Sequence, residues 1–205
     1  MKKRSVFICV FFCVAGGVLF ARDAVLSGFI RKLNVALVAD SKSPVLPGLA
    51  DLEDYGFFDK DNYPPEEYFA VDRLNDITSV YVTYASYITE YEDEFVFFHN
   101  NLIWYMSDVL NHYKDNENSD LVQMLTGMTT VLKGSIQVFS ASDDLRTENR
   151  RVIAENTYEV ISEWWPVFTK PMQAQLFLEA VKSSEKETDE EIRKILDNML
   201  ELMKL

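Results

Sequence analysis

The sequence has little cysteine, histidine, glycine and proline. Its 205 residues include two cysteines, two histidines, seven glycines and six prolines. Both cysteines, Cys9 and Cys13, lie near the N-terminus, so the remaining chain has no thiol for a disulfide scaffold, a thiolate nucleophile or Cys-ligated zinc. The sequence also contains no Cys-x-x-Cys-His motif, which excludes a c-type haem. The few glycines and prolines exclude collagen-like and low-complexity chains.

Basic residues are fewer than acidic ones. The chain has 20 Lys and Arg against 33 Asp and Glu, which gives a formal charge of −13. This charge disfavours nucleic acid and anionic membrane surfaces as partners. Apolar residues make up 48% of the chain and aromatic residues 13%. That content is enough for a packed core and excludes a globally disordered chain.

The N-terminus has the layout of a secretory signal. The basic residues 2–4 precede an uncharged stretch over 5–20, followed by the small residue Ala21 and the polar Arg22. We expect cleavage after Ala21 and a periplasmic or secreted protein. Cleavage would remove three basic residues and no acidic one, and would lower the formal charge to −16. The absence of an Asn-x-Ser/Thr sequon favours a bacterial envelope protein over a eukaryotic glycoprotein.

Two alternatives to cleavage after Ala21 remain open. The segment could be retained as a membrane anchor, although its 16 to 17 apolar residues are few for a span. It could also be a lipoprotein signal with Cys13 as the lipidated residue, although the preceding Phe12 is bulkier than such signals prefer.

Apolar periodicity predicts an all-α fold with no sheet. Residues 66–126 contain neither glycine nor proline. Within them, apolar and aromatic residues recur at alternating spacings of three and four: Leu74, Ile77, Tyr81, Tyr84, Ile88, Tyr91, Phe95, Phe98, Leu102, Tyr105, Val109 and finally His112. This pattern predicts one heptad-patterned helix over 72–114, about 65 Å long at 1.5 Å per residue. Such a helix indicates an elongated bundle or a coiled-coil-like pairing.

Shorter periodic segments surround this helix. We expect an elongated antiparallel bundle of about five to six helices. The further predicted helices are 24–38, 120–140, 147–165, 170–182 and 189–204. Residues 39–65, which contain four prolines and interleaved acidic and aromatic residues, are predicted to be a loop held against the domain. The predicted organisation is a signal peptide (1–21), a short helix plus acidic aromatic loop (22–65) and a helical bundle domain (66–205).

The sequence offers no constellation typical of an enzyme, a metal site or a cofactor site. Asp108 and His112 have helical metal-ligand spacing but no matching second pair. Residues 59–62 resemble the start of a calcium loop but lack its glycine and terminal glutamate. The acidic run 90–94 is interpreted as a solvated helix face. Nucleophile-elbow and phosphate-loop motifs do not occur, so we expect a non-enzymatic protein without cofactors.

Two sets of aromatic residues are candidate binding sites. Phe97 and Trp104 lie on a second apolar stripe of the long helix, and Trp165 follows Trp164 where a helix ends. These three are candidate contacts for a protein partner or for self-association. Trp165 is a candidate exposed anchor, and the alternative, which the sequence favours, is that it packs under the turn at 166–170. The leading hypothesis is therefore an exported interaction or scaffold protein. The alternative is a periplasmic small-ligand binding module with a pocket between helices, lined by Tyr81, Tyr84 and Tyr91.

Overall fold

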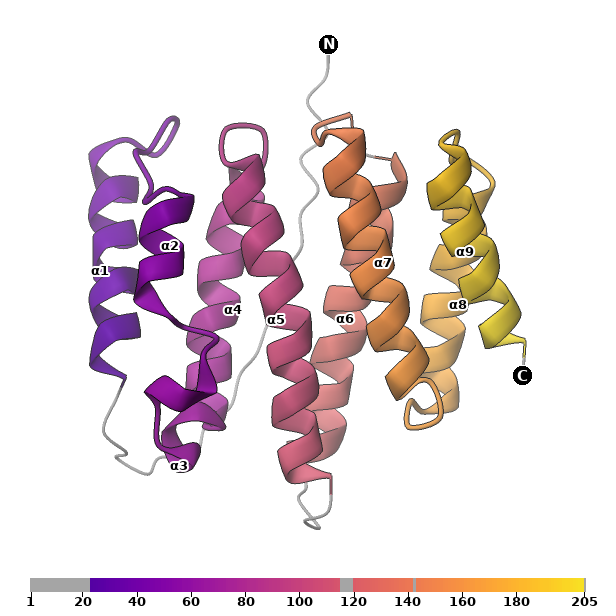
Figure 1. Ribbon diagram of the computed structural model, residues 1–205, viewed down its shortest axis with the longest axis horizontal. Coiled ribbons are helices and arrows are strands. Elements are labelled where there is room, and N and C mark those ends of the chain that lie inside the picture. The colour runs from indigo at the N-terminus through magenta and orange to yellow at the C-terminus, as the bar shows by residue number, and fades with distance from the viewer. Residues whose placement is uncertain (1–22, 115–119, 142, 205) are drawn as a thin grey trace. The chain divides into compact units, whose positions relative to one another are not determined.

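The structure is a computed structural model that describes residues 23–114, 120–141 and 143–204. These residues form nine α-helices and one short 3-10 turn, and none of them lies in a strand, which confirms the all-α prediction (Figure 1). The helices are α1 (Ala24–Ala39), α2 (Leu49–Tyr55), α3 (Pro65–Tyr68), α4 (Val71–Ser86), α5 (Glu92–Tyr113), α6 (Asp120–Ala141), α7 (Thr147–Trp164), α8 (Lys170–Ser184) and α9 (Glu190–Met203). The predicted signal segment, residues 1–21, lies outside the described residues.

Five predicted helices, α1 and α6 to α9, begin and end within two residues of their expected limits. Local signals fix these ends. The Asp23 carboxylate accepts hydrogen bonds from the first backbone amides of α1, and Asp189 does the same for α9. Pro171 lies in the first turn of α8, where its missing amide costs nothing.

The predicted single helix over 72–114 is wrong. Helix α4 ends at Ser86, and α5 begins at Glu92 after a turn in which the Tyr87 carbonyl accepts the amides of Glu90 and Tyr91. The acidic residues 92–94 form the first turn of α5, where negative charge stabilises a helix start, so they are not a mid-helix face. The expectation of an elongated bundle rested on the unbroken helix and loses its basis.

The apolar pattern of this region packs against itself across the turn. Tyr81 of α4 stacks on Phe95 of α5, with ring centroids 5.5 Å apart, and Tyr84 stacks on Phe98 at 5.4 Å. The spacing of three and four continues through the turn because the apolar side chains of α4 and of α5 pack into the same core. The expected helix count was low because this break and the short helices α2 and α3 were not predicted.

The chain divides into two compact units, with a boundary between Leu102 and Ile103 inside α5. In the first unit, described from residue 23, α1 packs against α4. The segment predicted as a loop over 39–65 contains α2, and its Phe57 is 1% exposed. The Phe57 ring lies 5.1 Å from that of Phe29 in α1 and 6.3 Å from that of Phe98. The segment is therefore part of the core of this unit.

The second unit stacks one helical hairpin on another. Helix α6 packs against α7 and α8, and α9 packs against α7 and α8. In Figure 1, α7 and α9 form the layer nearer the viewer, with α6 and α8 behind them. This is the local packing of stacked helix pairs. The C-terminal part of α5 joins this unit through side-chain hydrogen bonds to α7.

Candidate functional site

An exposed tryptophan is held in place between α5 and α7. Trp104 is 38% exposed, and its indole nitrogen donates a hydrogen bond to the Asn156 side-chain oxygen at 3.0 Å. The Asn156 amide nitrogen in turn donates to the Val152 carbonyl at 2.9 Å, and the Val152 side chain is 40% exposed. The indole and the valine therefore form an apolar surface in which the ring is oriented by a hydrogen bond.

A second network fixes the same two helices further along. The Trp164 indole donates to the Ser107 hydroxyl at 2.8 Å, and that hydroxyl donates to the Glu163 carboxylate at 3.2 Å. The Asn111 amide donates to the other Glu163 oxygen at 3.1 Å. These contacts set the register of α5 against α7, and they hold an exposed carboxylate in one position.

The surface along these two helices is acidic. Asp108 follows Trp104 by one turn on α5, while Glu155, Glu159 and Glu163 are exposed on α7. Lys114 contributes one positive charge at the end of α5, where it donates a hydrogen bond to Asn111. Helical spacing places the following residues along one strip, which we name the Trp104 face: Trp104, Asp108, Val152, Asn156, Glu159 and Glu163. Its apolar end is therefore followed by carboxylates along both helices.

The other two predicted partner contacts are more buried than Trp104. Phe97 is half-buried in the first unit, 6.1 Å from the Phe58 ring and 5.9 Å from the Phe98 ring. Only 8% of Trp165 is exposed, so the exposed-anchor hypothesis is wrong and the favoured interpretation of a buried indole is confirmed. Helix α7 ends at Trp164, and the following turn brings α8 back so that Gln173 hydrogen-bonds the Trp165 carbonyl at 2.8 Å. Adjacent indoles can both be buried when the helix stops between them.

The tyrosines of the predicted pocket contact the chain itself. The Tyr84 hydroxyl donates to the Pro47 carbonyl at 2.8 Å, and the Tyr91 hydroxyl donates to the Pro44 carbonyl at 2.7 Å. Tyr81 is buried against Phe95, and its hydroxyl has no hydrogen-bond partner among the described residues. Burial raises the pKa of Tyr81 and of Tyr84. Residues 44–47 thus occupy the place that the sequence suggested for a ligand at Tyr84 and Tyr91.

A buried arginine, which sequence reasoning missed, organises the first unit. Arg73 is 3% exposed, and its Nε lies 3.2 Å from the Asp23 carboxylate that caps α1. It also donates to the Phe57 carbonyl. Its guanidinium lies over the Tyr63 ring at 4.2 Å and over the Tyr68 ring at 5.2 Å. The sequence pattern places Arg73 on a helix next to Leu74. It contains no local signal that predicts the contacts of Arg73 with Asp23, Phe57 and the two tyrosine rings.

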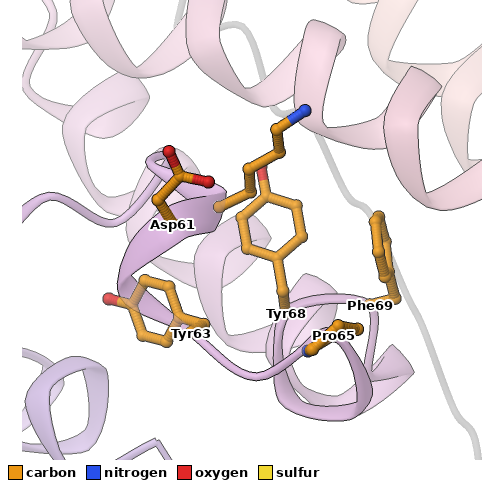
Figure 2. Close-up of a pocket in the computed structure, with 6 residues that line it drawn as sticks. Asp61, Tyr63, Pro65, Tyr68 and Phe69 are labelled. Carbon is orange, nitrogen blue, oxygen red and sulfur yellow. The ribbon is translucent and has the colours of Figure 1, made fainter.

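A surface hollow lies beside these two rings. It has a volume of about 330 Å³ and is lined by Lys60, Asp61, Tyr63, Pro65, Tyr68 and Phe69 (Figure 2). All six lining residues belong to the segment that connects α2 with α4, which sequence reasoning left largely as a loop. The aromatic content of this segment was the one feature of the sequence that could have indicated a binding site there.

The first unit contains a histidine, His99, whose titratable ring has no contact with solvent. His99 is fully buried next to Tyr81 and Phe95, and its Nδ1 lies 3.1 Å from the Asn100 side-chain oxygen. Burial lowers its pKa from 6.5 to about 4, so the ring is neutral at pH 7. At that pH the neutral ring packs as part of the core.

The described residues contain neither a metal-binding cluster nor a membrane-spanning helix that would point to a function. Among residues 23–114, 120–141 and 143–204, no group of three or more His, Asp or Glu side chains could hold a metal ion. Within the same ranges, no helix has both the length and the hydropathy that crossing a bilayer requires. No protein-family model, curated protein or solved structure matches the chain.

Proposed function

We propose that this chain is an exported, non-enzymatic interaction protein of a bacterial envelope, and that it binds a basic segment of a protein partner through the Trp104 face. The observation that carries the proposal is an exposed indole held by a hydrogen bond and followed by carboxylates on the same two helices. This refines the hypothesis that the sequence suggested for Trp104, and it leaves out Trp165, which is buried.

The indole is suited to be the anchor of an interface. Tryptophan is enriched among the residues that carry most binding energy at protein interfaces. The hydrogen bond to Asn156 already fixes the orientation of the ring, so a partner would lose less affinity in ordering it. Val152 extends the apolar surface by one further side chain.

The acidic surroundings favour a basic partner over a second copy of the chain. A second copy docking through the same face would bring Glu159 and Glu163 against like charges, which costs free energy. A lysine-rich or arginine-rich segment would instead meet complementary charge, and the formal charge of −16 of the cleaved chain would speed its approach. An amphipathic basic helix could place an apolar side chain on Trp104 and cations one or two turns away.

A designed peptide tests the binding proposal. The probe is a lysine/leucine amphipathic helical peptide, and its control is the same peptide with glutamate in place of lysine. Calorimetric titration of the lysine peptide should give binding that Trp104→Ala weakens about tenfold or more, since a hot-spot residue is worth about 2 kcal/mol. Leu178→Ala is the matched control, because Leu178 is 65% exposed on α8.

The charge part of the proposal needs its own variants. The double variant Asp108→Asn, Glu159→Gln should weaken the lysine peptide a few-fold, whereas the double variant Glu53→Gln, Asp54→Asn on α2 should not. Equal effects of the two double variants, or equal effects of the two apolar substitutions above, would show that the peptide binds by net charge alone and would contradict the proposal.

Export is tested separately, by the N-terminus of the protein. Asp23, the cap of α1, lies two residues after Ala21, so cleavage there would leave the first helix with its cap. Expression in a Gram-negative host, followed by mass spectrometry of the periplasmic fraction, should give a chain that begins at Arg22. A chain that retains Met1, or one that begins at a lipid-modified Cys13, would contradict the proposed processing.

A further inference from the structure

We infer that the hollow lined by Lys60, Asp61, Tyr63, Pro65, Tyr68 and Phe69 binds a free aromatic amino acid, with the ligand ring among the aromatic side chains and its charged groups on Lys60 and Asp61. This site goes beyond the proposed partner binding. It lies in the other unit of the chain and rests on different residues.

The walls of the hollow are largely aromatic, and their rings contact one another, so a ligand ring would lie against their exposed edges and faces. The Tyr63 and Tyr68 rings have centroids 6.2 Å apart, and the Phe69 ring meets that of Tyr68 edge to face at 5.0 Å. Figure 2 shows Tyr63 and Phe69 on opposite sides of Tyr68, with Pro65 at the base of Tyr68. A volume of about 330 Å³ is at the small end for ligand pockets, which suits a ligand of one amino acid.

Hydrogen bonds hold the hollow in shape without a ligand. The Tyr68 hydroxyl donates to the Phe58 carbonyl at 3.2 Å, and the Asp59 carboxylate accepts the Asp61 backbone amide at 3.0 Å. The Asn62 amide donates to the carbonyl of Gly56, whose φ of +59° favours glycine. A pre-formed site loses less affinity in ordering its own side chains.

The two charges at the rim of the hollow match the two charges of a zwitterion. Lys60 and Asp61 are consecutive and exposed, and neither forms an ion pair with another described residue. An α-amino acid carries its ammonium and carboxylate on one carbon, so it can meet an adjacent Asp and Lys while its side chain enters the hollow. A ligand with one charge could form only one of these two ion pairs.

The electrostatics of the walls disfavour a simple cation. The Tyr63 and Tyr68 rings already carry the Arg73 guanidinium over a face, at 4.2 and 5.2 Å. A second cation against the same rings would gain less from their quadrupoles and would be repelled by the guanidinium. A net-neutral ligand avoids that repulsion, which separates this hollow from an aromatic cage for quaternary ammonium groups.

Saturation-transfer NMR and calorimetry with phenylalanine as the probe test the site. We expect binding with a dissociation constant of about 1 mM or below, which is within reach of a ligand of this size. Alanine, which lacks the ring, should bind more than about tenfold more weakly. Phenylalanine amide lacks the carboxylate and N-acetylphenylalanine lacks the ammonium, so each should bind about three- to fivefold more weakly, as expected for one exposed ion pair.

Two conservative variants assign the charges without disturbing the aromatic walls. Lys60→Gln should weaken phenylalanine but leave phenylalanine amide unchanged, and Asp61→Asn should weaken phenylalanine but leave N-acetylphenylalanine unchanged. Lys42→Gln and Asp54→Asn are matched controls at exposed positions of the same unit and should change nothing.

Three outcomes would overturn the inference. They are no saturation transfer from phenylalanine at about 10 mM, affinities that neither rim variant alters, and tighter binding of tetramethylammonium than of phenylalanine. None of these affects the lysine-peptide experiment, so the two proposals stand or fall separately.

Discussion

The buried His99 should make this protein less stable as the pH falls from neutral toward 4. The ring is fully buried, and burial lowers its pKa from 6.5 to about 4. In the unfolded chain the same ring takes up a proton near pH 6.5. The unfolded state therefore binds more protons than the folded state between these two values, and the free energy of unfolding falls as the pH falls through this window.

The size of the effect follows from the pKa difference. One unit corresponds to about 1.36 kcal/mol, so a shift from 6.5 to about 4 amounts to about 3 kcal/mol once the pH is below the folded-state value. The contribution is fully present above about pH 6.5 and is lost progressively toward pH 4. Domains of this kind are stable by about 5–15 kcal/mol, so the loss is a sizeable fraction.

Chemical denaturation at several pH values between 7 and 4 measures this contribution. His99→Phe keeps a ring between Tyr81 and Phe95 but cannot be protonated, so its stability should fall less with acid than that of the wild type, by about 3 kcal/mol. His112→Gln, at the exposed histidine, should follow the wild type. Equal pH dependence of the wild type and His99→Phe, or an NMR titration of His99 near pH 6.5, would refute the reasoning.

Three further predictions concern buried contacts, each measured by chemical denaturation. Tyr84→Phe leaves the carbonyl that its hydroxyl contacts without a partner and should cost about 1–3 kcal/mol, whereas Tyr87→Phe, at an exposed hydrogen bond, should cost under about 0.5 kcal/mol. Glu187→Gln breaks the ion pair of the buried Glu187 with Arg150 and should lower the free energy of unfolding by about 3 kcal/mol. Glu185→Gln, at an exposed position, should lower it by almost nothing. Trp165→Ala should cost about 3 kcal/mol or more, because the indole is buried; a cost near zero would restore its reading as an exposed anchor.

Helix ends were predictable where a local signal produces them. Pro166 lies two residues after the end of α7, and Asp189 caps α9 with its own carboxylate. Such signals act within one turn of the chain, so one sequence contains all the information that they need. The helices α1 and α6 to α9 follow from them almost residue by residue.

The break between α4 and α5 could not be read from apolar spacing. Ile88 and Tyr91 continue the spacing of three and four through the turn, so the pattern stays in register on both sides of it. The missed signal was the acidic cluster at 92–94, which marks a helix start more often than a helix middle. Charge at a helix end is weaker information than eleven apolar or aromatic positions in register, yet here it marks the position of the turn.

For the candidate site, the sequence indicated Trp104 but not the residues that it contacts. Trp104 was singled out by its place on an apolar stripe, but its partner Asn156 lies 52 residues away. Arg73 and Asp23 are likewise 50 residues apart. Contacts at such separations depend on how whole helices pack, and one sequence has no spacing rule for them.

The indole NMR signals of the three tryptophans test the central claim most directly. In ¹⁵N-labelled protein, each of Trp104, Trp164 and Trp165 gives one indole N–H resonance. Titration with the lysine/leucine peptide should shift the resonance of Trp104, whose hydrogen bond to Asn156 lies at the surface, and leave those of the buried Trp164 and Trp165 in place. Shifts confined to Trp164 or Trp165, or no shift at saturating peptide, would contradict binding at the Trp104 face.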